Sequence, residues 1–202
     1  MTFFPSVPDD GHILHVFNRF PKGMDPLFAF HDIVLRGPSD LSIGERELIA
    51  AYVSALNDCS FCFNSHRVYA TSFGIDPEIF DALVADIDSA PVKDALKPIL
   101  HYAKKLTREP VKMVQADADA VFKAGWSEAA LHDAILVVNL FNFMNRIIFA
   151  HGVDGNDARY AARLNTALSS PEAEREAANK SEIGSDNYAA FGDLVKKGEL
   201  PD

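Results

Sequence analysis

The feature that most constrains the fold of this chain is the spacing of its apolar residues, which recur every three or four positions along nearly every long segment. Ser42 and Glu45 form a capping-box pattern that marks the start of one such segment. The apolar face that follows consists of Leu48, Ile49, Tyr52, Val53 and Leu56. This period is that of an amphipathic α-helix, and the alternating pattern of half-buried strands is absent. We therefore predict an all-α fold.

Proline, glycine and capping residues divide the chain into helices. We expect helices over about 12–20, 26–35, 45–56, 59–73, 111–123, 128–150 and 188–197. Two further helices are expected between these, one that begins at 76–78 and one that ends at 106. Residues 41–168 are predicted to form the core domain, with 1–40 as an N-terminal extension packed on it. Residues 169–202 form a polar C-terminal segment, in which 169–186 is expected to be a mobile or extended link before the last short helix.

Length and charge narrow the class of protein. A chain of 202 residues suits one domain with a substantial core. The formal net charge is −10 and no basic run exists, which argues against nucleic-acid binding. No N-terminal signal pattern is visible, and the longest apolar run, 134–138, is too short to span a bilayer. We expect no membrane association and a cytoplasmic location.

The chain has two cysteines, and they lie three positions apart at Cys59 and Cys62, with His66 four positions further on. In the cytoplasm such a pair is more often catalytic or metal-bound than a permanent disulfide. Structural zinc is the main alternative, but these residues supply three ligands where zinc prefers four. His31, His101 or His151 would have to complete the set from a distance. We expect redox chemistry and no metal.

Asn57 and Asp58 interrupt the helical pattern just before the cysteines. If the chain reverses there, both sulfurs lie in the first turn of the next helix, where the helix dipole favours a thiolate. Spacings of three and four residues place Cys62 and His66 on the same helical face as Cys59.

Glu47 precedes Cys59 by twelve residues, which on one straight helix is about 18 Å. A reversal at Asn57 and Asp58 would instead make the two helices antiparallel and bring Glu47 opposite His66. A carboxylate in that position orients the imidazole and raises its basicity. Glu45 is the competing carboxylate, and the capping box explains it better. The predicted order of contacts is Glu47, His66 and a cysteine, as in a nucleophile–base–orienter triad.

These residues resemble a known family. The segments 45–57 and Cys59-x-x-Cys62-x-x-x-His66 are similar to the AhpD-like alkylhydroperoxidases of the carboxymuconolactone decarboxylase superfamily, and more closely to the branch called peroxidase-related proteins. The segments 124–127 and 141–146 are similar to the same branch, so that the resemblance covers roughly residues 40–155. It implies an all-α AhpD-like helical bundle, with the Cys-x-x-Cys pair at the N-terminus of a helix that follows a helix-turn.

The resemblance also implies a function. It predicts a cofactor-free oxidoreductase that reduces organic hydroperoxides or hydrogen peroxide and is reset by an external dithiol or thioredoxin-like reductant. It assigns the catalytic proton relay to Glu47, Cys59, Cys62 and His66. In this assignment the peroxide oxidises Cys62 to a sulfenic acid, and Cys59 then forms the disulfide with it. It implies a homo-oligomer, a trimer or hexamer. One departure is Phe61, where well-known members carry a second histidine, which predicts a shorter relay or a drier site.

Two other functions stay open at this point. The wider superfamily contains lactone decarboxylases, lyases that use no dithiol. A non-enzymatic oligomer whose disulfide senses redox state is the other alternative. Asn142, Asn145 and Arg146 interrupt an apolar helix, and we interpret them as structural hydrogen-bonding residues before substrate-binding ones.

Overall fold

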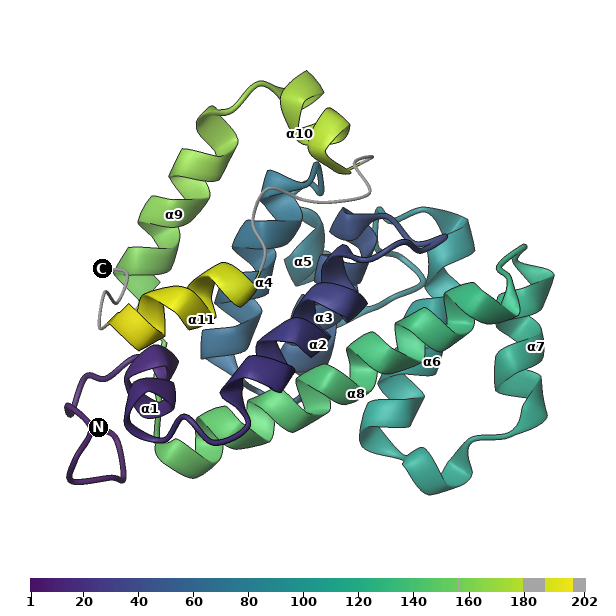
Figure 1. Ribbon diagram of the computed structural model, residues 1–202. Coiled ribbons are helices and arrows are strands. Elements are labelled where there is room, and N and C mark those ends of the chain that lie inside the picture. Colours follow the sequence, from purple (N-terminus) through teal and green to yellow (C-terminus); the bar gives the residue numbers. More distant parts are fainter. Residues whose placement is uncertain (156, 180–187, 198–202) are drawn as a thin grey trace.

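The computed structural model describes residues 1–155, 157–179 and 188–197, and over these ranges its regular structure consists of helices alone (Figure 1). The all-α prediction is confirmed. The elements are α1 (Ile13–Arg19), α2 (Met24–Arg36), α3 (Ile43–Leu56), α4 (Ser60–Ser72), α5 (Ile79–Ala85), η1 (Asp94–Leu96), α6 (Lys97–Arg108), η2 (Pro110–Lys112), α7 (Gln115–Lys123), α8 (Glu128–His151), α9 (Asp157–Ser169), α10 (Glu172–Asn179) and α11 (Tyr188–Lys197).

The core is built around α3, in which every residue except Ala55 is buried. A helix that is enclosed on all sides lies at the centre of a fold rather than on its surface. α4 and α8 both pack against α3, and α8 also contacts α4. Figure 1 shows α8 running along the bundle, with α6 and α7 at one end and α1 and α11 at the other. The charged residues within α3 are therefore forced to find partners in the interior.

Two expectations about helix boundaries are wrong. Residues 111–123 do not form one helix, because Met113 and Val114 take extended backbone angles and separate η2 from α7. Residues 172–179 form α10 rather than part of an extended link. Glu172 and Glu174 lie in its first turn, where acidic side chains complement the helix dipole. The remainder of the expected link, 180–186, lies outside the described residues.

α8 is the one described helix that is long and apolar enough to cross a membrane, judged by length and composition alone. In this fold it packs against α2, α3, α4 and α6 inside the bundle. Core helices of globular proteins pass the same test, so its length is weak support for a membrane span.

The C-terminal helix α11 is held against the N-terminal helix α2. The carboxylate of Asp32 accepts the backbone amides of Tyr188 at 2.5 Å and Ala189 at 3.0 Å, which caps the start of α11. At the other end of α11, Lys196 pairs with Asp25 at 2.9 Å. These contacts fix the position of the Tyr188 side chain over the centre of the bundle.

The start of α3 offers a test of the fold. The Ser42 hydroxyl accepts the Glu45 amide at 3.2 Å, and the Glu45 carboxylate accepts the Ser42 amide at 2.9 Å. We expect Ser42→Ala to lower the free energy of unfolding by about 1 kcal/mol, because it leaves a helix-terminal amide without its acceptor. Urea unfolding measures this. The exposed Ser170 is the control, and an equal effect of Ser170→Ala would contradict the capping role.

Candidate active site

The predicted chain reversal lies between α3 and α4. Asp58 has a left-handed φ of 56°, a conformation that Asp and Asn tolerate better than other residues. The amide of Cys59 donates to the carbonyl of Ser54 at 2.9 Å, which closes the turn. The side-chain amide of Asn57 donates to the side-chain oxygen of Asn145 at 2.9 Å and connects the turn to α8. The reversal is confirmed, and it makes α3 and α4 antiparallel.

Both cysteines are buried free thiols at the start of α4. Cys59 is the N-cap residue and Cys62 lies in the first turn, as predicted. A hydrogen bond between the two thiols, more than any other influence, lowers the pKa of Cys59, and the backbone amide of Cys62 adds to this effect. The same bond, together with burial, raises the pKa of Cys62 well above its ordinary value. The pair therefore behaves as one unit in which Cys59 holds the negative charge more readily.

Glu47 and His66 meet as the antiparallel arrangement predicts. His66 Nδ1 lies 2.6 Å from Glu47 Oε2, and the Glu47 side chain has no exposed surface. His66 is also buried, one helical turn beyond Cys62 on the same helix. The structure thus brings all four predicted site residues to the facing surfaces of α3 and α4.

Arg36 is a fifth member of the site that the sequence analysis missed. Its Nη1 lies 2.5 Å from the second Glu47 oxygen, Oε1. The guanidinium carbon lies 5.8 Å from the ring centre of Tyr69, 4.9 Å from that of Phe73 and 5.2 Å from that of Tyr188. These distances are typical of cation–π contacts. The sequence holds one signal for this role: Arg36 continues an apolar helical face, and a buried cation requires a carboxylate partner.

The two partners of Glu47 keep it ionised. Burial alone would raise the pKa of this carboxyl group, but the charges and hydrogen bonds of Arg36 and His66 outweigh burial and lower the pKa to about 2. The hydroxyl of Tyr188 adds a longer contact to Oε1 at 3.4 Å. An ionised carboxylate only accepts hydrogen bonds, so Nδ1 of His66 carries the proton of their shared bond.

Asn145 joins α8 to the cysteine turn. Its side chain is fully buried and donates to the Ser54 hydroxyl at 3.0 Å while accepting from Asn57. Its amide also lowers the pKa of both thiols through hydrogen bonding. The structural interpretation of Asn145 is confirmed, and so is that of Asn142, which accepts from Asn57 at 3.1 Å. Arg146 is exposed and donates back to Asn142 in its own helix.

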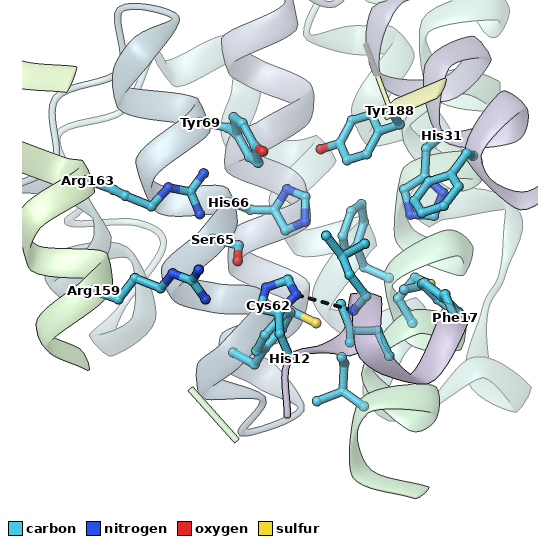
Figure 2. Close-up of a pocket in the computed structure, with 17 residues that line it drawn as sticks. His12, Phe17, His31, Cys62, Ser65, His66, Tyr69, Arg159, Arg163 and Tyr188 are labelled. Carbon is cyan, nitrogen blue, oxygen red and sulfur yellow. Dashed lines mark hydrogen bonds between the residues drawn. The ribbon is translucent and has the colours of Figure 1, made fainter. Parts of the chain in front are cut away.

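A cavity of about 250 Å³ opens beside α4 (Figure 2). Cys62, Ser65 and His66 line it, whereas Cys59, which is hydrogen-bonded to Cys62, does not. Phe61, the departure from the family pattern, adds an apolar ring to the wall. Other apolar lining residues are Ile13, Leu14, Phe17, Phe28, Phe141 and Met144. No sequence pattern predicts this cavity, because residues from α1, α2, α4, α8, α9 and α11 form it.

In the described part of the chain, no three His, Cys, Asp or Glu side chains gather in a geometry that could hold a metal ion. His101 pairs with Asp88 at 2.8 Å, and His151 contacts the carbonyl of Ile147. His31 lines the cavity, where burial lowers its pKa to about 4 and keeps it neutral near pH 7.

Part of the chain matches a known protein family. Residues 21–105 match the carboxymuconolactone decarboxylase family, and this range contains Arg36, Glu47, both cysteines and His66. The chain is 28% identical to an uncharacterized Bacillus subtilis (strain 168) protein, YdfG, over 132 residues, which are 65% of this chain and 88% of that protein.

Two solved structures share the fold. An uncharacterized peroxidase-related protein from Silicibacter sp. TM1040 superposes with a TM-score of 0.69 at 27% identity, covering 75% of this chain and 79% of that one. An uncharacterized peroxidase-related protein from Ralstonia eutropha JMP134 is described as an alkylhydroperoxidase AhpD core. It superposes with a TM-score of 0.67 at 23% identity, and the match covers 79% of this chain and 94% of that one.

The buried carboxylate predicts a pH dependence of stability. The pKa of Glu47 is about 2 in the folded chain against an ordinary 4.5, so its stabilising contribution is complete above about pH 4.5 and is lost as the pH falls toward 2. We expect Glu47→Gln to lower the free energy of unfolding by about 3–5 kcal/mol at pH 7, because Arg36 loses its ionic partner. The same substitution should make the free energy of unfolding fall less steeply below pH 4.5. Urea unfolding from pH 2 to 7 measures both effects. Parallel curves for the variant and the wild-type protein would contradict the assignment.

Proposed function

The chain belongs to the AhpD-like group of the carboxymuconolactone decarboxylase superfamily, and from this we propose that it is a thiol peroxidase with a Cys59–Cys62 dithiol–disulfide cycle. One observation carries the proposal. Glu47 contacts His66 at 2.6 Å, and His66 lies one turn beyond Cys62 in the same cavity. A nucleophile at the start of α4, a base one turn further along it and an orienting carboxylate on α3 are thereby combined.

The proposed cycle has three steps. The Cys62 thiolate attacks one oxygen of a hydroperoxide, the O–O bond breaks, and the sulfur becomes a sulfenic acid while the departing alkoxide takes up a proton to form an alcohol. Cys59 then attacks this sulfur, which releases water and closes the disulfide. An external dithiol reduces the disulfide by exchange and is itself oxidised.

The different surroundings of the two sulfurs support this division of roles. Cys62 lines the cavity, so a peroxide bound there meets this sulfur first. Cys59 does not line the cavity, and it has the lowered pKa of the two thiols. A resolving thiol must itself be deprotonated to attack the sulfenic acid, and a low pKa favours that. Burial and the bond to Cys59 raise the pKa of Cys62, so the formation of its thiolate requires a base that takes up the proton.

His66 is the proposed proton carrier. Its Nδ1 donates to Glu47, so Nε2 is left with a lone pair that can accept a thiol proton and later return it to the alkoxide. Arg36 keeps Glu47 ionised, which fixes this tautomer and stabilises the imidazolium when it forms. Arg36 is thus a positioning residue that acts through Glu47.

The partners and setting of the enzyme belong to the same proposal. We propose a cofactor-free homo-oligomer, a trimer or hexamer, in the cytoplasm, with an external dithiol or thioredoxin-like protein as its reductant. The family resemblance supports the oligomer and the reductant, and the cytoplasmic location follows the expectation from the sequence.

A lyase of the decarboxylase type is the second candidate, and the description of the matching family favours it. Such a reaction requires no thiol cycle. Lyase activity that persists after alkylation of both thiols would favour it over the peroxidase. A redox sensor would instead oxidise readily and never turn over with a reductant.

Substitution of each cysteine tests the cycle. We expect Cys62→Ser and Cys59→Ser each to abolish turnover with an organic hydroperoxide and a dithiol reductant, because the disulfide cannot close. Mass spectrometry after a substoichiometric dose of peroxide should show an intramolecular 59–62 disulfide in the wild-type protein and a trapped sulfenic acid on Cys62 in the Cys59→Ser variant. Undiminished turnover of either variant would defeat the proposal.

Substitution of Glu47 tests the relay. We expect Glu47→Gln to slow the reaction of Cys62 with peroxide by about 10–100-fold, since an amide neither fixes the tautomer of His66 nor stabilises its cation. Stopped-flow measurement of peroxide consumption gives the rate. Glu45→Gln is the matched control, because Glu45 caps the same helix and does not contact His66. Equal rates for the two variants would exclude the relay.

A further inference from the structure

His31 is a buried histidine of the cavity that the proposed proton relay does not use. It lies on α2 with 4% of its surface exposed, and it lines the cavity together with Cys62 and His66. Its Nδ1 lies 2.8 Å from the carbonyl oxygen of Leu27, one turn back along the same helix. Because a carbonyl oxygen only accepts hydrogen bonds, Nδ1 carries the ring proton and Nε2 is left with a lone pair.

No group in the described part of the chain donates a hydrogen bond to Nε2 of His31. The ring instead contacts three aromatic rings, with centre-to-centre distances of 6.4 Å to Phe28, 6.2 Å to Phe141 and 5.0 Å to Tyr188. Its lowered pKa keeps the ring neutral near pH 7. Buried polar atoms in proteins nearly always have a hydrogen-bond partner. A neutral acceptor without one, on the wall of a cavity, is suited to a ligand that brings a donor.

His31 and His66 pack against the same aromatic ring. Their ring centres lie 6.2 and 4.2 Å from that of Phe141, and each meets it edge to face. Figure 2 shows His31 on the opposite side of His66 from Arg159 and Arg163, the charged residues of the lining. The contacts of the His31 ring are all with aromatic groups, apart from the bond to its own helix. This end of the cavity therefore offers one hydrogen-bond acceptor in largely apolar surroundings.

The size and lining of the cavity indicate what else the ligand carries. Its volume of about 250 Å³ is several times that of one water molecule, about 30 Å³ in the liquid. Apolar side chains of α1, α2 and α8 form much of its wall, among them Leu14, Phe17, Phe28 and Met144. Hydrogen peroxide, which is little larger than water, would leave most of this space unfilled. A hydrocarbon group fits beside the O–H group and buries apolar surface there.

We propose that the cavity binds a neutral, apolar compound that carries one O–H group, and that this group donates its hydrogen bond to Nε2 of His31. The inference deepens the proposed function and rests on it in one respect: the substrate is an organic hydroperoxide in preference to hydrogen peroxide. The O–H group of such a substrate is on the terminal oxygen, which is the oxygen that Cys62 takes. His31 is then a substrate-binding residue and transfers no proton.

Equilibrium binding to the reduced full-length chain tests the site without any turnover. 2-Phenyl-2-propanol is the probe, because it is the alcohol that cumene hydroperoxide would leave and it does not oxidise thiols. Its methyl ether lacks a hydrogen-bond donor, and isothermal titration calorimetry measures both compounds. We expect the alcohol to bind about fivefold more tightly, because only the alcohol satisfies the buried lone pair. Equal affinity for the two compounds, or tighter binding of the ether, would overturn the proposal.

Nuclear magnetic resonance identifies the acceptor. The ¹⁵N resonance of an unprotonated imidazole nitrogen moves upfield when that nitrogen accepts a hydrogen bond. We expect the Nε2 resonance of His31 to move upfield on addition of 2-phenyl-2-propanol and to stay in place on addition of the methyl ether. An upfield shift at His66 with none at His31 would show that the alcohol donates to His66, and this would overturn the role of His31.

Substitution of His31 tests the same assignment. His31→Phe keeps a planar ring and removes the acceptor, so we expect it to abolish the preference for the alcohol, whereas His31→Gln, with a side-chain oxygen, should keep part of it. His151→Phe is the matched control, because Nδ1 of His151 also lies 2.8 Å from a carbonyl one turn back, that of Ile147, and His151 is not among the lining residues. A preference that persists in His31→Phe would contradict the assignment. If circular dichroism shows that a variant does not fold, the wild-type affinities and the ¹⁵N shift still decide the question.

A kinetic comparison separates this inference from the proposed function. We expect His31→Phe to raise the KM for cumene hydroperoxide about fivefold and to leave the rate of Cys62 alkylation by iodoacetamide unchanged, because His31 binds the peroxide and does not activate the thiol. Turnover with the same KM in His31→Phe and the wild-type protein would overturn the role of His31 and leave the peroxidase standing. Binding of the alcohol that depends on His31, without any peroxide turnover, would do the reverse.

Discussion

The structure depends on one buried carboxylate. Glu47 lies on the central helix α3 with no exposed surface, where an isolated charge would be very costly. Arg36 of α2 and His66 of α4 each engage one of its oxygens. The hydroxyl of Tyr188 of α11 makes a longer contact with Oε1. Four helices are therefore tied to one side chain. A buried ion pair of this kind contributes little net stability compared with apolar packing, which suggests that chemistry rather than stability explains its presence.

The same carboxylate connects the fold to the reactive sulfurs. The left-handed turn at Asp58 sets α4 antiparallel to α3 and places Cys59 at a helix N-cap. His66 then stands between Glu47 and the cavity that contains Cys62. The two sulfurs differ through position alone, because Cys62 lines the cavity while Cys59 does not and has the lower pKa. An identical pair of side chains is thereby placed in two different environments.

The cavity combines groups that are distant in the chain. Helices from both ends, α1 and α11, close over it, and α9 supplies its arginines. Phe61, which stands where the family pattern has a histidine, forms part of the apolar wall of the cavity. A relay that relies on His66 alone needs a cavity from which bulk water is largely excluded.

The sequence by itself determined most of the site geometry that depends on neighbours along the chain. The Ser42 cap, the reversal at Asn57 and Asp58, and the shared face of Cys62 and His66 follow from helix geometry, and the Glu47–His66 pairing needed only one antiparallel turn in addition. Local composition misled where it was ambiguous, since the polar segment expected to be extended forms α10. The tertiary structure alone decided that Arg36, Tyr188 and the α9 arginines reach the site. Their positions depend on how separate helices cross, which is set by packing across the whole core and leaves no spacing pattern in the sequence.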